Sequence, residues 1–186
     1  MSELGTSVKV QSLPDPEAIV SPPEKLLRAF NELRDELVST LWYILGNRDD
    51  AQDTAQEAFL KCWRAQATLK DVRDLRAWIF RVSLNAAKDL QRSAWHRRAK
   101  LLNGEEGILA SQDAAPAQTA EDKEDMEKLR QGIMTLRPDE KEVFLLRQNG
   151  DLTYEQIAEI RQSPVGTVKT QMRSALQKLR RVLKDK

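Results

Sequence analysis

Apolar side chains in this 186-residue chain recur at intervals of three or four positions in several separate segments. The first such run comprises Leu26, Phe30, Leu33, Leu37, Leu41 and Ile44. An interval of three to four residues places apolar side chains on one face of an α-helix, whereas a half-buried strand would alternate every second residue. The sequence contains no strand-like alternation and no internal repeat, so we expect an all-α protein.

The periodicity predicts three helices in the first half of the chain, over about residues 24–45, 49–65 and 75–100. Gly46 and Asn47 provide a stop signal after the first of them. The second helix is expected to bury Ala51, Ala55, Ala58, Phe59 and Cys62. The third helix is expected to bury Trp78, Ile79, Val82, Ala86 and Leu90.

Four more helices are predicted in the second half. Met126, Leu129, Ile133 and Leu136 form one helix face, and Pro138, followed by two acidic residues, begins the next helix, which Gly150 closes. Thr153 and Gln156 have the spacing of a capping box, which predicts a short helix over residues 154–160. The last helix should begin near Pro164, and its apolar stripe is Val168, Met172, Ala175, Leu176, Leu179 and Leu183.

Composition divides these helices into two groups. Residues 1–23 contain four prolines and no apolar period, which predicts a flexible arm. Residues 101–120 are rich in small, polar and acidic residues and are expected to form a flexible acidic linker. We therefore expect two small helical domains, over residues 24–100 and 121–186, joined by this linker.

Residue counts exclude several classes of protein. One cysteine and one histidine are too few for a Cys/His zinc site or an internal disulfide, which fits a protein of the reducing cytoplasm. The apolar runs are far shorter than the roughly 20 residues that cross a bilayer, so no membrane insertion is expected. No nucleophile–base pair, pocket-forming carboxylate cluster or glycine-rich phosphate loop is found, so we predict neither an enzyme nor a cofactor.

The net charge of +1 conceals two basic segments. Residues 64–100 carry ten basic and three acidic side chains, and residues 160–186 carry eight basic side chains and one acidic one. Between them, residues 101–128 hold eight acidic and two basic side chains. Clustered lysine and arginine neutralise phosphates, so two basic segments predict two contacts with a nucleic acid. Solvated helix faces are the plainer alternative.

The predicted short helix, a turn at residues 161–163 and the longer basic helix form a helix-turn-helix. The outer face of the longer helix combines cations suited to phosphates with short polar side chains suited to base edges. Its candidate DNA-contacting residues are Thr167, Lys169, Thr170, Gln171, Arg173, Ser174 and Lys178.

Three motifs in order resemble those of the bacterial extracytoplasmic-function (ECF) sigma factors of RNA polymerase. LTYEQIAEI at residues 152–160 and PVGTVKT at 164–170 resemble the promoter-reading domain of that family. DAQDTAQEAFL at residues 50–60 is similar to its polymerase-binding helix, and LRAWIFRVSLNAAKD at 75–89 to its promoter-melting helix. The resemblance implies a promoter-specificity subunit that directs transcription initiation at one regulon.

The resemblance also implies partners and roles for individual residues. Asp53, Gln56 and Glu57, part of an acidic stripe on the second helix, would dock on RNA polymerase core through the β′ coiled coil and β. The helix-turn-helix would bind the minus-thirty-five element of promoter DNA. An anti-sigma factor would hold the protein inactive, and the linker would allow the two domains to be clamped together.

The third helix would bind the minus-ten element. Its candidate residues are Arg76, Arg81, Asn85, Lys88 and Arg92. Trp78, Phe80 and Trp95 could provide aromatic walls for unstacked bases, although core packing is the plainer role for Trp78. By resemblance, Asn85 and the loop before the helix, about residues 67–74, form the pocket for a flipped base.

One departure from the family concerns the turn between the reading helices. Members usually place a glycine where the turn needs a positive φ, but this chain has Gln162 in the sequence Arg161-Gln162-Ser163. A non-glycine residue there should cost about 1 kcal/mol of stability.

Two other functions remain open from the sequence. A free-standing transcription regulator of the response-regulator output type would have a similar helix-turn-helix, but it leaves the motif around Asp53 unexplained. A nuclease would need metal-binding carboxylates beside the basic surface, and the spacing of Asp71, Asp74 and Asp89 forms no obvious site.

Overall fold

The computed structural model describes residues 21–101 and 120–184, which form helices and contain no strand. The N-terminal half (residues 21–101) contains α1 (Pro22–Leu45), α2 (Arg48–Arg64), a short 3-10 helix (Gln66–Asp71) and α3 (Leu75–Leu101). The C-terminal half (residues 120–184) contains α4 (Ala120–Thr135), α5 (Pro138–Gln148), α6 (Tyr154–Arg161) and α7 (Val165–Lys184). The all-α prediction is confirmed, whereas most of the predicted arm and linker lies outside the described residues.

Local signals fix the helix ends. Gly46 ends α1 in the left-handed region at φ +77°, and the Asn47 side chain accepts hydrogen bonds from the backbone N–H groups of Asp49 and Asp50 to begin α2. The capping box at Thr153 and Gln156 is present at the start of α6. Gly150 follows α5, and a Cβ there would lie 2.5 Å from the Leu146 carbonyl oxygen, so this close approach requires glycine.

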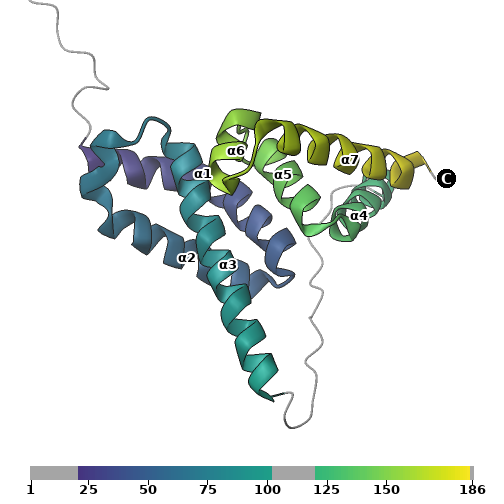
Figure 1. The fold of residues 1–186 in the computed structure, drawn as a ribbon, viewed down its shortest axis with the longest axis horizontal. Helices are drawn as coiled ribbons and strands as arrows, with labels where there is room; N and C mark the ends of the chain where they lie inside the picture. The colour runs from purple at the N-terminus through teal and green to yellow at the C-terminus, as the bar shows by residue number, and fades with distance from the viewer. Residues whose placement is uncertain (1–20, 102–119, 185–186) are drawn as a thin grey trace, which may run out of the picture.

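The core of the N-terminal half forms where α1, α2 and α3 pack against one another (Figure 1). All the residues predicted for α2 are buried except Phe59, which is partly buried. The prediction for α3 was wrong in part, because Trp78, Val82 and Leu90 are only partly buried. Phe80 and Leu84 are buried in their place, since α3 contacts both α1 and α2 and must bury a wider face than a single stripe.

In the C-terminal half, α7 packs on α4, α5 and α6. Val168, Met172, Ala175 and Leu179 are buried, as the stripe predicts. Two apolar residues of the predicted faces, Met126 on α4 and Leu183 on α7, are instead exposed. Leu183 lies at the C-terminal end of α7, one turn beyond the buried Leu179.

The two halves also contact each other, mainly through α1 and α5 and through α3 and α6 (Figure 1). The Asn149 side-chain amide donates a hydrogen bond of 3.1 Å to the hydroxyl of Thr40, which is 1% exposed on α1. The guanidinium of Arg130 on α4 lies 5.9 Å from the ring centroid of Trp42. These contacts bring the face of α3 beside the helix-turn-helix.

Candidate nucleic-acid and protein interfaces

An acidic patch lies on the outer face of α2. Asp53, Gln56 and Glu57 are all exposed, as their spacing predicts, because Ala51, Thr54, Ala55 and Ala58 point into the core. Glu57 forms an ion pair of 2.9 Å with Lys61 one turn further along the helix. The structure thus presents the three residues together on one accessible surface.

Apolar side chains that the sequence analysis did not select extend this patch. Leu60 is 48% exposed and Trp63 is 38% exposed, and they follow Gln56 at intervals of four and three residues on the same helix face. The partly buried Phe59 packs against Trp63, with 5.9 Å between ring centroids, and Phe30 packs edge-on against Phe59 at 5.0 Å. An outward-facing apolar pair beside an acidic stripe is typical of a protein-binding surface, and its i, i+3 spacing was visible in the sequence.

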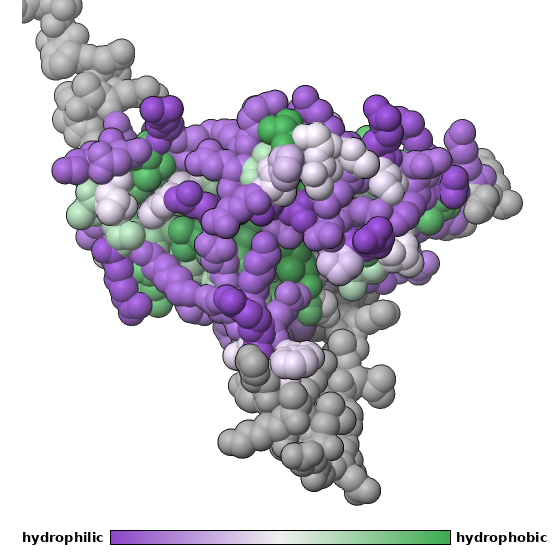
Figure 2. Space-filling model, viewed as in Figure 1, coloured by the Kyte–Doolittle hydropathy of each residue, from purple (hydrophilic) through white to green (hydrophobic). Residues whose placement is uncertain are grey.

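The exposed strip of α3 carries most of the predicted minus-ten residues. Arg81, Asn85 and Arg92 are exposed and Lys88 is half-exposed, at intervals of four, three and four residues. Trp78 precedes this strip and Trp95 follows it at the same helical spacing. Phe80 is fully buried, so the expectation that it walls a site for unstacked bases was wrong. Figure 2 shows mainly hydrophilic residues over the face on which α3 crosses the molecule.

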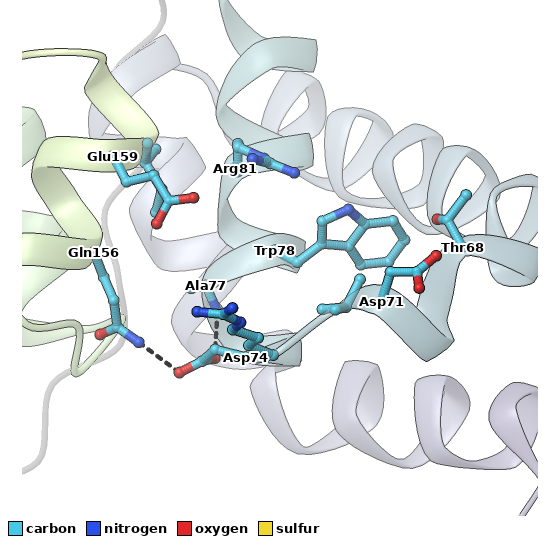
Figure 3. Close-up of a pocket in the computed structure, with 11 residues that line it drawn as sticks. Thr68, Asp71, Asp74, Ala77, Trp78, Arg81, Gln156 and Glu159 are labelled. Atoms are coloured by element: carbon cyan, nitrogen blue, oxygen red, sulfur yellow. Dashed lines mark hydrogen bonds between the residues drawn. The ribbon is translucent and has the colours of Figure 1, made fainter.

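A cavity of about 480 Å³ lies at the N-terminal end of this strip. The 3-10 helix and the following loop form one wall, Trp78 and Arg81 of α3 form the second, and Gln156 and Glu159 of α6 form the third (Figure 3). The indole of Trp78 points into the cavity between Asp71 and Arg81 (Figure 3). The Gln156 amide donates a hydrogen bond of 2.5 Å to the Asp74 carboxylate, which joins the two halves at the cavity rim.

Asn85 does not line this cavity, although the sequence analysis grouped it with the loop at residues 67–74. It lines a second, more open hollow of about 790 Å³ further along α3. Lys88, Asp89, Gln91, Arg92 and Trp95 complete that hollow. Two separate hollows therefore lie along the strip, the cavity at Trp78 and the hollow between Asn85 and Trp95.

Two of the predicted DNA-binding cations of α3 are engaged by the C-terminal half. The Lys88 ammonium lies 2.8 Å from the Glu142 carboxylate of α5, and the Arg76 guanidinium donates a hydrogen bond of 3.1 Å to the Gly150 carbonyl oxygen. Glu142 also lies 3.5 Å from the guanidinium of Arg161. In this arrangement both of these cations bind groups of the C-terminal half.

The helix-turn-helix is formed by α6 and α7. Gln162 ends α6 at φ 51° and ψ 46°, so the turn has the left-handed residue that the sequence predicts, without a glycine. The backbone N–H of Ser163 donates to the Ala158 carbonyl oxygen at 3.0 Å and closes the turn. Because Val168 and Met172 are buried, Thr167, Lys169, Thr170 and Arg173 point outward.

The other three predicted residues of α7 have partners within the same half. Gln171 accepts a hydrogen bond from Arg161. Ser174 and Lys178 both bind the buried carboxylate of Glu140, at 2.7 Å and 2.6 Å. Burial raises the pKa of Glu140, but the hydrogen bonds from Lys178, Ser174 and the Arg137 backbone outweigh it and hold the pKa below its ordinary value.

Tyr154 is a feature of this domain that the sequence analysis did not select. Its ring lies between two cations, the Arg147 guanidinium at 5.6 Å and the Lys169 ammonium at 5.9 Å from the centroid. The contact orients Lys169 at the N-terminal end of α7. The place of Tyr154 at the start of α6, directly after the capping residue Thr153, was evident in the sequence, but the approach of Arg147 depends on how α5 packs.

Within residues 21–101 and 120–184, no group of three or more His, Cys, Asp or Glu side chains could hold a metal ion. Cys62 is buried, and burial raises the pKa of its thiol to about 12, which fits the predicted core role. No helix in the described parts of the chain is both long and apolar enough to cross a membrane.

Both halves of the chain match known protein families. Residues 29–97 match the family model described as sigma-70 region 2, and residues 126–179 match that described as sigma-70, region 4. The chain is 28% identical over 159 residues to the ECF RNA polymerase sigma factor SigW of Bacillus subtilis, covering 82% of this chain and 85% of that protein. It is 29% identical over 156 residues to the RNA polymerase sigma-H factor of Pseudomonas aeruginosa, covering 78% and 81%.

Solved structures show the same fold. The sigma factor RpoE of Bartonella quintana, in complex with the anti-sigma factor NepR, superposes with a TM-score of 0.70 at 22% identity, over 87% of this chain and 96% of that one. CnrH in complex with the cytosolic domain of CnrY superposes with a TM-score of 0.56 at 22% identity, over 87% and 94%.

Proposed function

The chain belongs to the sigma-70 family as an ECF sigma factor, and from this premise we propose that it binds RNA polymerase core and directs it to the promoters of one regulon. The observation that carries this proposal is the presence of region 2 and region 4, in that order, on the two helical halves. A free-standing regulator of the response-regulator output type is not favoured, because it would account for α6 and α7 but not for the match over α1–α3. Members of this family are initiation factors and not enzymes, and we assign no catalytic residue.

The role of each part of the chain is assigned from the surfaces described above. Residues 24–100 form the core-binding and minus-ten domain, residues 121–186 form the minus-thirty-five domain, and residues 1–23 and 101–120 are the arm and the linker. Asp53, Gln56 and Glu57 bind the β′ coiled coil, and their exposure on one face of α2 supports this role. Leu60 and Trp63 add apolar area to the same contact.

Promoter DNA contacts both halves in this proposal. Arg76, Arg81, Asn85, Lys88 and Arg92 bind the minus-ten element along α3. Thr167, Lys169, Thr170 and Arg173 enter the major groove, since they are exposed on the first turns of α7. Gln171, Ser174 and Lys178 need only modest rearrangement to reach the same DNA, because none of the three is fully buried.

We assign an anti-sigma factor as the regulatory partner, acting in the cytoplasm where RNA polymerase works. The sigma factor RpoE of Bartonella quintana is bound to the anti-sigma factor NepR, and CnrH is bound to the cytosolic domain of CnrY. The contacts between the two halves of this chain are compatible with a form that such a partner holds closed.

The test is a titration of the purified protein against RNA polymerase core, with random-sequence duplex DNA titrated in parallel. We expect tight binding to core and weak binding to DNA alone. Asp53→Ala with Gln56→Ala should abolish core binding and leave the helical content and melting temperature unchanged. The matched control, Asn31→Ala with Asp35→Ala on the exposed face of α1, removes the same charge and should bind core normally.

Tight, sequence-selective DNA binding without affinity for core would overturn the proposed function. Normal affinity of the Asp53 and Gln56 double variant for core would overturn the assignment of the α2 patch alone.

A further inference from the structure

Arg161, the last residue of α6, has a side chain that is only 9% exposed, and each of its guanidinium nitrogens has a partner. Nη2 lies 2.9 Å from the carboxylate of Asp139, and Nε lies 3.5 Å from that of Glu142, both on α5. Nη1 donates a hydrogen bond to the side-chain oxygen of Gln171 on α7. Arg161 thus joins α5, α6 and α7, which pack against one another (Figure 1).

The two carboxylates fix the direction of the Arg161 guanidinium. Glu142 is largely buried, with 12% of its side chain exposed, and Asp139 lies in the first turn of α5. A guanidinium is planar and presents its N–H groups in a rigid fork, so contacts to Nε and Nη2 leave little freedom for Nη1. The donor that binds Gln171 is therefore held in place by α5.

This bond determines how the Gln171 amide is oriented. Arginine has N–H donors and no acceptor, so it binds the amide oxygen and not the amide nitrogen. Among the described residues, no acceptor receives the N–H groups of that nitrogen. Gln171 is partly exposed and follows the exposed Thr167 by one helical turn, on the face of α7 proposed to enter the major groove. The group that Gln171 offers to DNA is therefore a donor.

A donor alone distinguishes bases differently from a complete amide. A free glutamine side chain binds adenine through two hydrogen bonds, one accepted from N6 and one donated to N7. The Gln171 oxygen is directed at Arg161 and is not available to the adenine N6 amino group. Guanine presents two acceptors, N7 and O6, on the same edge. A glutamine held in this way favours guanine over adenine.

We propose that Arg161 determines the base specificity of the helix-turn-helix by holding the oxygen of Gln171, so that Gln171 donates to the acceptor edge of a guanine in the minus-thirty-five element. Arg161 acts through Gln171 and is a positioning residue. The inference rests on the proposed function, which places α7 in the major groove of that element.

The experiment measures the base preference of the holoenzyme at every position of the minus-thirty-five element. Holoenzyme is incubated with a promoter library in which this element is randomised, and the bound DNA is sequenced. The variants are Gln171→Ala, Arg161→Leu, Arg161→Lys and the double variant Arg161→Leu with Gln171→Ala. Arg180→Leu is the matched control, because it removes the same charge from an exposed position of α7. Core affinity and thermal unfolding are measured first for every variant.

The position that Gln171 contacts is the one at which Gln171→Ala loses its base preference. Wild type should prefer guanine to adenine there by about 5- to 150-fold, the range for one specific base contact. Arg161→Leu frees the amide oxygen to accept from adenine, so the ratio of guanine to adenine should fall below one. Arg161→Lys keeps a donor for the oxygen and should retain the preference for guanine.

The remaining variants separate positioning from a structural role. The double variant should match Gln171→Ala in its base preference, because Arg161 acts only through Gln171. Arg180→Leu should match the wild type. If Arg161 only stabilised the fold, Arg161→Leu would weaken binding to all sequences equally, so an unchanged preference for guanine in that variant would overturn the inference.

The wild type decides the inference if Arg161→Leu does not fold. A preference for adenine at the position identified by Gln171→Ala would overturn it, and so would a Gln171→Ala variant that changes the preference at no position. If the wild type fails to bind core, the proposed function fails separately. The isolated chain is then given the same library at low salt, where phosphate contacts are strongest, and the same outcomes decide the inference.

Discussion

The two basic helices, α3 and α7, differ in how much of each is buried. In α7 one apolar stripe, including Val168, Met172 and Leu179, packs on α4–α6 and the opposite face is exposed. In α3 the buried residues include Ile79, Phe80, Leu84, Ala86 and Ala87, which occupy a much wider face of the helix, against α1 and α2. Only a narrow strip of α3 therefore remains exposed.

The two helices also differ in what holds their cations. Lys178 of α7 binds Glu140 within its own half, whereas Lys88 of α3 binds Glu142 and Arg76 binds the Gly150 carbonyl oxygen, both in the other half. The proposed binding of the minus-ten element by α3 would therefore depend on how the two halves are placed. The exposed cations Lys169 and Arg173 of α7 are not engaged in this way, so the comparison predicts that separation of the halves affects α3 more than α7.

The largest effect is expected from a change in the wide buried face of α3. Leu84→Ala should lower the free energy of unfolding by about 2–5 kcal/mol, because Leu84 is 1% exposed and its loss leaves a cavity. The partly buried Val82 provides a matched control, and Val82→Ala should cost less than about 1.5 kcal/mol. Urea denaturation followed by circular dichroism measures both. Equal costs would contradict the placement of Leu84 on the buried face and of Val82 at its edge.

The next effect concerns the anchor between α5 and α7. Glu140→Ala should destabilise the C-terminal half by about 1–3 kcal/mol at pH 7, because it leaves the groups that bind the buried carboxylate without their acceptor. The folded pKa of Glu140 is lowered, so its stabilising contribution is complete above the unfolded pKa and is lost as the pH falls through the folded pKa.

Denaturation of wild type and Glu140→Ala at pH 7 and at progressively lower pH tests this sign. The difference in stability between the two proteins should shrink as the solution becomes acidic. A difference that stays constant or grows toward low pH would contradict it.

A smaller effect is expected at the turn before α7. Gln162→Gly should raise the stability by about 1 kcal/mol, since glycine adopts φ 51° without the steric cost of a side chain. The converse change in the N-terminal half, Gly46→Ala at φ +77°, should lower the stability by a similar amount. Thermal denaturation compares them, and a less stable Gln162→Gly variant would show that the Gln162 side chain contributes contacts that outweigh its strain.

The smallest energetic effect is expected at the link between the halves. Glu142→Gln removes an ion pair in which the Lys88 side chain is 44% exposed. The free energy of the contact between the halves should therefore change by about 1 kcal/mol or less. The radius of gyration from small-angle scattering should still rise, because fewer molecules remain closed. Glu32→Gln, which removes an exposed pair inside α1, is the control and should leave the radius unchanged. An unchanged radius for Glu142→Gln would show that other contacts keep the halves together.

Much of the candidate site could be predicted from the sequence where it depends on local spacing. The exposure of Asp53, Gln56 and Glu57 and the left-handed turn at Gln162 follow from neighbouring residues alone. The burial of Phe80 could not be predicted in the same way, because the spacing of apolar residues does not show how wide a face of α3 is covered by α1 and α2. The separate placement of Asn85 and the loop at residues 67–74 likewise depends on the direction of α3.

The sequence by itself determined the helices, their caps, the helix-turn-helix and the two basic segments. Each of these depends on residues within about one or two helical turns of each other, and apolar periodicity and capping act over that range. Only the tertiary structure decided which face of α3 is covered, which of its cations bind Glu142 and Gly150, and that Trp95 stands exposed beside a hollow. These outcomes depend on contacts between separate helices, whose packing is set by the fit of whole surfaces.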